Sequence, residues 1–282
     1  MNELIATVRN VSDTARWVAY FRARETQRPD ALFRDPFAER LAGERGFKIA
    51  NTLPDGNNQE WAWVARTYLF DQFTSLVIQE GADLVVNLAA GLDARPYRMD
   101  LPPSLEWVEV DFPEIISYKE DILASEKPVC RLERIPLDLS DVPARRTLFA
   151  DLNRRATKIA VLSEGLLIYF ATEDVGSLAK DLAAELNFQN WILDLASPGQ
   201  LKLMQGSSGK QLSEAGAGFK FGPPEGPNFF VPFGWEPIDI QGLLKTAAKF
   251  KRSPAGLFPM TIGRTGAPGD FPWTGVCLFN KR

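Results

Sequence analysis

One buried-strand pattern in the middle of the chain constrains the fold more than any other feature of the sequence. Residues 83–89 form a near-continuous apolar run, DLVVNLA, as expected of a strand that is covered on both faces. Further strands are predicted at residues 106–110, 158–163 and 191–195, and a helix at residues 172–186 separates the last two. Strands that alternate with helices indicate a parallel, doubly wound α/β sheet.

Helices are predicted on the N-terminal side of this pattern. Residues 12–28 and 61–78 both have apolar residues at helical spacing. A shorter helix is predicted at residues 35–41, with Pro36 at a first helical position. The first 80 residues are therefore expected to form a helical layer that has no sheet of its own.

Residues 199–235 have a different composition, because glycine and proline are frequent there. Long irregular segments of compact domains are often lids. The aromatic residues near the end of this segment favour a lid that packs onto the protein, and a flexible connection is the alternative. A helix at residues 240–249 and a strand at residues 274–279 are predicted to follow.

The 282-residue chain contains no histidine. This absence excludes hydrolases that use a Ser-His-Asp or Cys-His arrangement, and it excludes nearly all zinc enzymes. We therefore predict no metal site. The composition favours a reaction in which a cofactor supplies the activation and the protein supplies position.

The charge and cysteine content exclude several kinds of partner. The formal net charge is −4, so no global attraction to nucleic acid or to an anionic membrane is expected. No apolar run reaches the length of about 18 residues that suggests a membrane span. The two cysteines are too few for a disulfide framework, and the N-terminus does not have the pattern of a secretory signal. We expect a cytoplasmic protein.

The first predicted strand leads into a turn that contains Gly91, and the second strand ends at Asp111, twenty positions later. In open α/β sheets, ligands bind at the carboxyl ends of the strands, where a glycine lets the backbone approach them. A carboxylate at the position of Asp111 can accept hydrogen bonds from the ribose hydroxyls of a nucleoside. The alternative role for Asp111 is that of a helix N-cap.

Two details distinguish between possible nucleoside cofactors. Read as a dinucleotide-binding G-x-G-x-x-G motif, the turn supplies Ala89, Gly91 and Ala94, which is one glycine of three. NAD is therefore disfavoured, whereas S-adenosylmethionine needs no pyrophosphate cradle. At the end of another expected strand, Asp138 could accept from an adenine amino group while Leu139 lines the ring; the alternative for Asp138 is an ordinary turn residue.

A fourth strand end carries the sequence Ser-Glu-Gly at residues 163–165. This pattern places the carboxylate of Glu164 at the mouth of the sheet, where it could face the sulfonium or the amino group of the cofactor. A helix–turn ion pair is the alternative.

Several segments together resemble the leucine carboxyl methyltransferase family. They resemble most closely its bacterial branch, which contains provisionally assigned S-adenosylmethionine-dependent methyltransferases and polyketide O-methyltransferases. The resemblance covers residues 12–195, with a weaker match at residues 233–235. The segments are residues 14–26 (TARWVAYFRARET), 34–38 (RDPFA), 87–98 (NLAAGLDARPYR), 109–114 (EVDFPE), 138–139 (DL) and 163–170 (SEGLLIYF).

The resemblance implies a class I methyltransferase fold, which is Rossmann-like and has a seven-stranded, mostly parallel sheet with a reversed last strand and an N-terminal helical cap. It implies one domain that consists of a helical cap (1–80), a cofactor-binding core (81–198), a lid-like insertion (199–235) and a C-terminal helix and strands (236–282). It also implies S-adenosylmethionine as the cofactor. The implied cofactor-binding residues are Arg66, Ala89, Ala90, Gly91, Asp111, Phe112, Asp138, Leu139 and Glu164.

Arg66 and Ala89 differ in how well they match the family pattern. Arg66 resembles the family arginine that binds the carboxylate of the cofactor, a task that suits a guanidinium. Ala89 departs from the family pattern, because the chain has Ala89-Ala90-Gly91 where the family usually has Gly-Ala-Gly. If the first of these positions needs a positive φ angle, the alanine is expected to reduce cofactor affinity.

The absence of histidine also bears on the methyl acceptor. A carboxylate, with a pKa of about 4, is already ionised at neutral pH, whereas a hydroxyl group normally needs a base. We therefore predict a methyl ester formed on a small-molecule carboxylic acid, with Arg22 and Tyr169 positioning the acceptor and no residue acting as a base or nucleophile. An exposed salt bridge is the alternative role for Arg22. The alternative functions are hydroxyl O-methylation of an aromatic or polyketide, an NAD-dependent oxidoreductase, and a cofactor-binding protein without activity.

Overall fold

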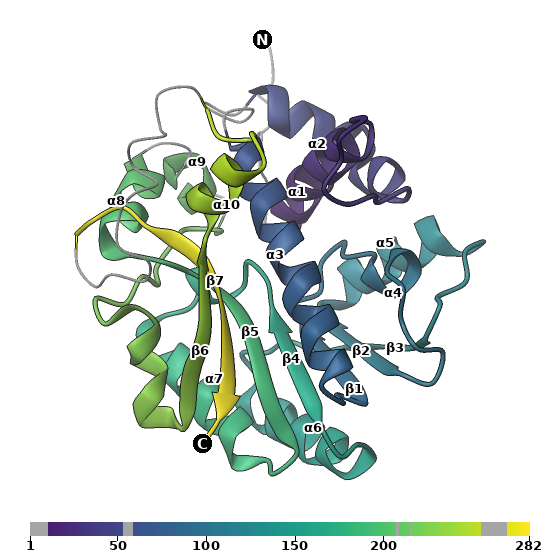
Figure 1. Ribbon diagram of the computed structural model, residues 1–282, viewed down its shortest axis with the longest axis vertical. Helices are drawn as coiled ribbons and strands as arrows, with labels where there is room; N and C mark the ends of the chain where they lie inside the picture. Colours follow the sequence, from purple (N-terminus) through teal and green to yellow (C-terminus); the bar gives the residue numbers. More distant parts are fainter. Residues whose placement is uncertain (1–10, 53–58, 207–208, 215, 255–269) are drawn as a thin grey trace.

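The computed structural model describes residues 11–52, 59–206, 209–214, 216–254 and 270–282 (Figure 1). Its strands form one seven-stranded sheet in the order β3-β2-β1-β4-β5-β7-β6. Strand β7 is antiparallel to both of its neighbours, and the other observed pairs are parallel. The strands are β1 (Leu84–Leu88), β2 (Glu106–Asp111), β3 (Arg131–Pro136), β4 (Ile159–Ser163), β5 (Phe188–Ala196), β6 (Trp235–Gly242) and β7 (Thr274–Lys281). The predicted fold class, with its reversed last strand, is confirmed.

Helices cover both faces of this sheet, which explains why the central strands are apolar along their whole length. Every residue of β1 and of β4 is buried. Along β1, Val86 packs with α6 (Val142–Arg155) and α7 (Thr172–Ala184) on one face, whereas Val85 packs with α3 (Glu60–Gln79) and α10 (Leu243–Lys249) on the other. The remaining helical elements are α1 (Val11–Thr26), α2 (Ala38–Thr52), α4 (Arg95–Arg98), α5 (Pro113–Leu123), η1 (Leu167–Tyr169), α8 (Pro198–Gly206), α9 (Gly209–Glu214) and η2 (Gly226–Phe233).

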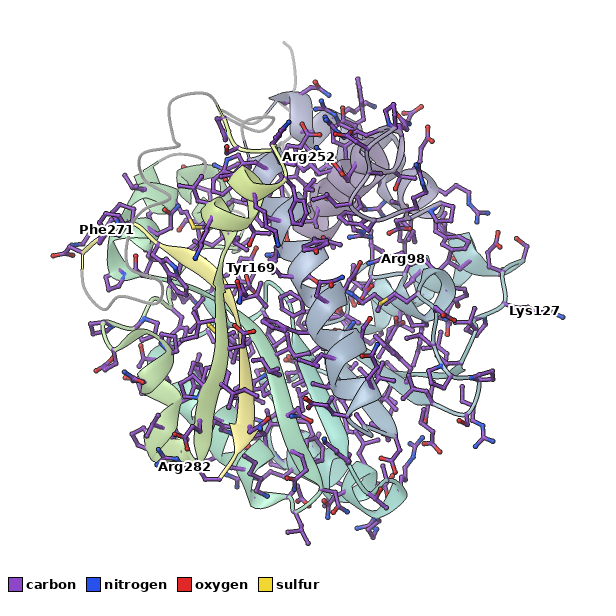
Figure 2. All side chains as sticks on the ribbon, viewed as in Figure 1. Arg98, Lys127, Tyr169, Arg252, Phe271 and Arg282 are labelled. Atoms are coloured by element: carbon purple, nitrogen blue, oxygen red, sulfur yellow. The ribbon has the colours of Figure 1, made fainter. Side chains whose placement is uncertain are left out.

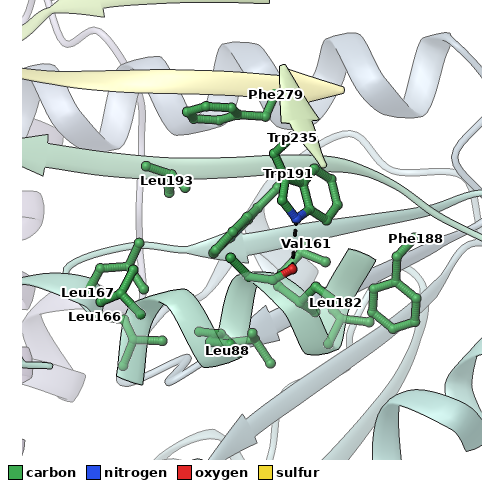
Figure 3. Packing of buried hydrophobic residues seen from close by; sticks show 14 of the residues in the cluster. Leu88, Val161, Leu166, Leu167, Leu182, Phe188, Trp191, Leu193, Trp235 and Phe279 are labelled. Atoms are coloured by element: carbon green, nitrogen blue, oxygen red, sulfur yellow. Dashed lines mark hydrogen bonds between the residues drawn. The ribbon is translucent and has the colours of Figure 1, made fainter. Parts of the chain in front are cut away.

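Strand β6 was not predicted, and the helix expected at residues 240–249 begins only at Leu243. The strand lies at the edge of the sheet, contains Pro237, and has a register shift between Pro237 and Asp239. Its burial pattern therefore lacks the regular alternation that would have revealed it. Its first residue, Trp235, is fully buried, and the indole Nε1 donates a hydrogen bond to the carbonyl oxygen of Ala179 on α7 at 3.0 Å (Figure 3).

The helix predicted at residues 35–41 is also corrected, because α2 begins at Ala38 and ends at Thr52. Pro36 lies before the helix rather than in its first turn. The Asp35 side chain accepts a hydrogen bond from the Phe37 amide at 3.2 Å, so an aspartate-centred turn precedes the helix. At Gly43 the backbone leaves helical geometry, with a φ angle of 56°.

The segment predicted as a lid-like insertion contains three helical elements, α8, α9 and η2. Phe230 of η2 is fully buried, and its ring centroid lies 5.2 Å from those of Trp191 and Phe279. This part of the segment is anchored in the core, and its role as a lid stays a prediction. Among the described residues, none of the helices combines the length and the apolar character that crossing a membrane requires.

The close pairing of β6 and β7 gives a first prediction. A Cβ atom at Gly275 of β7 would lie 2.7 Å from the carbonyl oxygen of Gln241 on β6 and would overlap the Trp273 ring. Gly275→Ala should therefore lower the free energy of unfolding by about 1–3 kcal/mol, the usual cost of overpacking. Thermal and denaturant unfolding measure this loss.

Gly206→Ala is the matched control, because an added Cβ there meets no atom within 4 Å. The control should change the free energy of unfolding by at most about 1 kcal/mol, in the stabilising direction that helix propensity favours. Equal losses in both variants would contradict the steric argument.

Candidate functional site

A cavity lies at the carboxyl ends of β1, β4 and β5, below the N-terminal helix α1. The cavity is open to solvent, and the empty space within it and its mouth is about 1440 Å³. Its lining residues come from α1, α3, the turn after β1, the turn after β4, the end of β5 and residues 200–221. Tyr169, labelled in Figure 2, is one of them.

The turn after β1 contains two residues with positive φ angles and is bonded to the end of β2. Ala89 and Gly91 both have left-handed backbone conformations, with φ angles of 51° and 50°. The amide of Gly91 donates a hydrogen bond of 2.6 Å to Asp111 Oδ2, so the two residues predicted to act together lie together. A Cβ atom on Gly91 would lie 3.3 Å from the Cβ of Ala15 on α1. Ala89, Ala90 and Gly91 all line the cavity.

Asp111 is held at the end of β2 by two amides. One oxygen accepts from Gly91, and the other accepts from Phe112 at 2.7 Å. Burial raises the pKa of Asp111, and these two amides oppose that rise. Phe112 itself is the N-cap residue of α5, without a side-chain capping bond, so the N-cap alternative for Asp111 is wrong.

Four predicted residues do not line the cavity: Asp111, Phe112, Asp138 and Leu139. Phe112 is 39% exposed, and Asp138 is exposed and accepts a hydrogen bond from the Ser140 amide at 2.8 Å. This contact is the turn geometry that was the alternative for Asp138. Leu139 is buried, and its carbonyl oxygen accepts from Arg145 at 2.9 Å. Their roles toward a nucleoside stay predictions.

Glu164 lies between two arginines at the cavity wall. Its Oε1 is 3.1 Å from Arg66 Nε, and its Oε2 is 2.9 Å from Arg95 Nη1. The helix–turn ion pair that was the alternative is therefore present, with its arginines on α3 and α4. Because Glu164 also lines the cavity, the ion pairs orient a carboxylate that a ligand can reach.

Arg66 is buried and packs on an aromatic ring. The guanidinium carbon lies 4.6 Å from the centroid of the Trp63 ring, and Nη1 lies 3.3 Å from Asp194 Oδ2. Burial alone would lower the pKa of Arg66, but the carboxylates of Asp194 and Glu164 raise it above its usual value. The arginine is therefore fully charged, as binding of a ligand carboxylate requires.

Two cavity residues, Arg95 and Asp194, were not predicted. Arg95 is 2% exposed and forms ion pairs with Asp71 and Asp93, both at 2.7 Å. Asp194 interrupts the apolar part of β5 and accepts a hydrogen bond from the Gly165 amide at 2.6 Å. Arg95 belongs to the motif at residues 87–98, and Asp194 is an acidic residue near the end of a predicted strand, so the signal used for Asp111 would also have found Asp194.

Arg22 is not in an exposed salt bridge, and that alternative is wrong. Its Nε lies 2.9 Å from Asp35 Oδ2, and the Asp35 side chain is fully buried. One Nη donates to the carbonyl oxygen of Leu92 at 2.5 Å, which joins α1 to the turn after β1. Arg22 is 7% exposed and lines the cavity.

Tyr169 also lines the cavity. Its hydroxyl lies 3.5 Å from Thr14 Oγ1 on α1, and its ring centroid lies 5.6 Å from that of Phe219. Burial raises the pKa of Tyr169, which keeps the phenol protonated at neutral pH. Its hydroxyl is thus a hydrogen-bond donor rather than a base.

The residues present fit S-adenosylmethionine. The left-handed turn at Ala89 and Gly91 brings backbone to the cavity, Asp111 holds that turn, and Arg66 offers a charged guanidinium. Within the described residues, no cluster of three or more carboxylate or cysteine side chains is arranged to hold a metal ion.

Comparison with solved structures finds the same fold in other proteins. A protein of the DUF574 family from Streptomyces avermitilis superposes with a TM-score of 0.63 over 95% of this chain and 97% of that protein, at 13% identity. A provisionally named methyltransferase from Thermobifida fusca gives 0.61 over 99% and 97%, at 15% identity. At these identities the similarity concerns the fold alone.

Sequence comparison gives the family. Residues 15–183 match the model of leucine carboxyl methyltransferases, and the chain belongs to that family. A Frankia alni protein, provisionally named an S-adenosyl-L-methionine-dependent methyltransferase, is 31% identical over 86% of this chain and 89% of its own length. The predicted resemblance is confirmed, and none of these relatives is named an oxidoreductase.

Other relatives carry the same provisional name but match over a shorter region. One from Mycobacteroides abscessus is 33% identical over 61% of each chain, and a second Frankia alni protein is 36% identical over 61% of this chain and 63% of its own length. The match thus spans about three fifths of the length of these relatives.

The left-handed conformation of Ala89 gives a second prediction. A side chain at a φ angle of 51° costs about 1–2 kcal/mol, whereas glycine adopts this conformation freely. Because glycine also gains entropy in the unfolded chain, Ala89→Gly should raise the free energy of unfolding by no more than about 1 kcal/mol. It should also bind S-adenosylhomocysteine at least as tightly as the wild type, as measured by calorimetry.

Ala90→Gly is the control for this change. Ala90 has no positive φ angle, so glycine there brings no relief and should destabilise the protein by roughly 0.5–1 kcal/mol. If the two variants lose stability equally, the strain assigned to Ala89 is wrong.

Proposed function

We propose that this protein is an S-adenosylmethionine-dependent O-methyltransferase that forms a methyl ester on a small-molecule carboxylic acid. S-Adenosylmethionine supplies a methyl group on a sulfonium, which is already an activated leaving group. The protein then has to hold the acceptor oxygen in line and exclude water, and orientation alone can contribute about 7–11 kcal/mol.

One observation carries the choice of acceptor: among the described residues, each of the three carboxylates that line the cavity is held in an ion pair. Asp93 pairs with Arg95, Glu164 with both Arg66 and Arg95, and Asp194 with Arg66. With no histidine in the chain, a carboxylate of the described cavity wall would have to leave its ion pair before it could remove a proton from the acceptor. An acceptor that arrives ionised suits such a site.

Arg22 is the side chain we assign to the acceptor carboxylate. Two of its nitrogens contact Asp35 and Leu92, and among the described residues no partner is found for its second Nη. A guanidinium fixed in this way loses little side-chain entropy when it donates a further hydrogen bond. Tyr169, whose phenol stays protonated, would turn its single O–H from Thr14 Oγ1, 3.5 Å away, to the same carboxylate.

The body of the acceptor is expected to be apolar, because aromatic side chains form one wall of the cavity. We call the part of the cavity that Trp17, Trp63, Tyr169 and Phe219 line the aromatic chamber. Trp17 and Trp63 meet edge to face with ring centroids 5.5 Å apart, and Tyr169 and Phe219 lie 5.6 Å apart. Such a wall favours an aromatic or aliphatic acid over a small polar one.

Hydroxyl O-methylation of an aromatic compound is the second candidate. Burial raises the pKa of Asp194, which favours its uptake of a proton. Its ion pair with Arg66 is long, at 3.3 Å, and a bound ligand could replace it. In that case Asp194 would accept the hydroxyl proton.

The third prediction separates these two acceptors. Protein incubated with radiolabelled S-adenosylmethionine and a panel of aromatic acids and phenols should give a product whose label alkali releases as methanol, because esters hydrolyse in alkali. An alkali-stable ether would instead support the hydroxyl candidate. Tight binding of NAD without any binding of S-adenosylhomocysteine would refute both.

The fourth prediction concerns the aromatic chamber. Phe219→Leu keeps an apolar side chain but removes the ring that would pack against the ring of an aromatic acceptor. Such a contact is worth about 0.5–1.5 kcal/mol. The KM for 2-naphthoic acid should rise about two- to tenfold, while the KM for a saturated bicyclic acid of the same size should change less. Steady-state kinetics with both acids measures the difference.

Phe271→Leu serves as the control, because Phe271 is 43% exposed and does not line the cavity. It should leave both KM values unchanged. Equal changes for the aromatic and the saturated acid in Phe219→Leu would mean that the chamber recognises size rather than aromatic rings.

A further inference from the structure

Asp194 joins two parts of the cavity wall that are distant in the sequence. It lies on β5, next to β4, and its side chain is 19% exposed. Oδ1 accepts a hydrogen bond of 2.6 Å from the amide of Gly165, in the turn after β4. Oδ2 lies 3.3 Å from Nη1 of Arg66, on α3. One carboxylate therefore sets the spacing between this turn and the arginine.

The turn is shaped to let the guanidinium approach closely. Gly165 has a φ angle of 67°, and a Cβ atom there would lie 3.0 Å from Nη1 of Arg66. A side chain at this position would push the guanidinium away, and its backbone would be strained. The glycine thus brings Arg66 and the turn into direct contact, with Asp194 bonded to both.

The other contacts of Arg66 hold its orientation. The Trp63 ring covers the guanidinium at 4.6 Å, and Nε donates to Glu164 Oε1 at 3.1 Å. No partner is found for the second Nη among the described residues. The side chain is therefore fixed while one of its nitrogens stays available, which is the arrangement that binding of a ligand carboxylate needs.

We propose that Asp194 is a positioning residue, which holds Arg66 and the Ser-Glu-Gly turn in the spacing at which Arg66 binds the carboxylate of the cofactor. This inference rests on S-adenosylmethionine as the cofactor in the proposed function, and it does not depend on the acceptor. Asp194 acts through Arg66, so its removal should affect only ligands that carry the carboxylate.

A different role would be direct contact between Asp194 and the ammonium group of the cofactor. The two roles are separable with three ligands. S-Adenosylhomocysteine has both charged groups, 5′-deoxy-5′-(3-aminopropylthio)adenosine has only the ammonium, and 5′-methylthioadenosine has neither. Isothermal titration calorimetry measures the binding of each ligand without any methyl transfer.

Asp194→Asn keeps the shape of the side chain and removes its charge. It should weaken the binding of S-adenosylhomocysteine about tenfold, near the lower end of the loss of a hydrogen bond to a charged group. The two ligands without the carboxylate should bind the variant and the wild type equally. In an Arg66→Met background the same substitution should have no further effect, because its partner is absent.

Asp239→Asn is the matched control, since Asp239 lies on strand β6, does not line the cavity and accepts a hydrogen bond from Gln241 at 2.7 Å. It should leave all three affinities unchanged. Asp194→Glu, which keeps the charge, should recover part of the lost affinity, and it replaces Asp194→Asn if that variant fails to fold.

Unchanged binding of S-adenosylhomocysteine in Asp194→Asn would overturn the inference. An equal loss for S-adenosylhomocysteine and the aminopropyl ligand would also overturn it, because Asp194 would then bind the ammonium itself. A wild-type protein that binds S-adenosylhomocysteine but methylates no carboxylic acid would refute the proposed acceptor only. The calorimetric pattern would support the positioning role in that case as well.

Discussion

The buried guanidinium of Arg95 connects the parts of this protein on which the cavity depends. Its partners are Asp71 on α3, Asp93 in the turn after β1, and Glu164 in the turn after β4. A charge that is 2% exposed is tolerated only when ionic and hydrogen-bonding partners surround it, so these elements must keep their relative positions. These ion pairs thereby hold helix α3 in a fixed position relative to the carboxyl ends of β1 and β4.

The same network continues into the N-terminal part of the chain. Asp71 also binds Arg98 at 2.7 Å, and Arg98 lies 3.8 Å from Asp35, the partner of Arg22. The helix α1 is thus attached to the sheet through a chain of alternating charges as well as through apolar packing. Because α1 supplies one wall of the cavity, these ion pairs also determine the shape of that wall.

Much of this arrangement could be predicted from the sequence, for identifiable reasons. Strand β1 is buried on both faces and so is apolar except at Asn87, while Gly91 lies in the turn that follows it and Asp111 ends β2. Strand β6 gave no such signal, because an edge strand with a proline has no regular burial. The pairing of Arg95 with Asp71, 24 positions earlier, depends on how α3 crosses the sheet, which local patterns do not contain. For the same reason Arg66 could be assigned by resemblance but not linked to Asp194.

The formal charges of the side chains that line the described cavity wall sum to zero. Three arginines, Arg22, Arg66 and Arg95, and three carboxylates, Asp93, Glu164 and Asp194, line its described wall. Such a site projects little electric field beyond its mouth, so an anionic acceptor is not drawn in from a distance, and its association rate should depend only weakly on ionic strength. Selectivity between ligands then depends on direct contacts, because a ligand must replace a partner in an ion pair that already exists. Ligands are therefore expected to differ more in their dissociation rates than in their association rates.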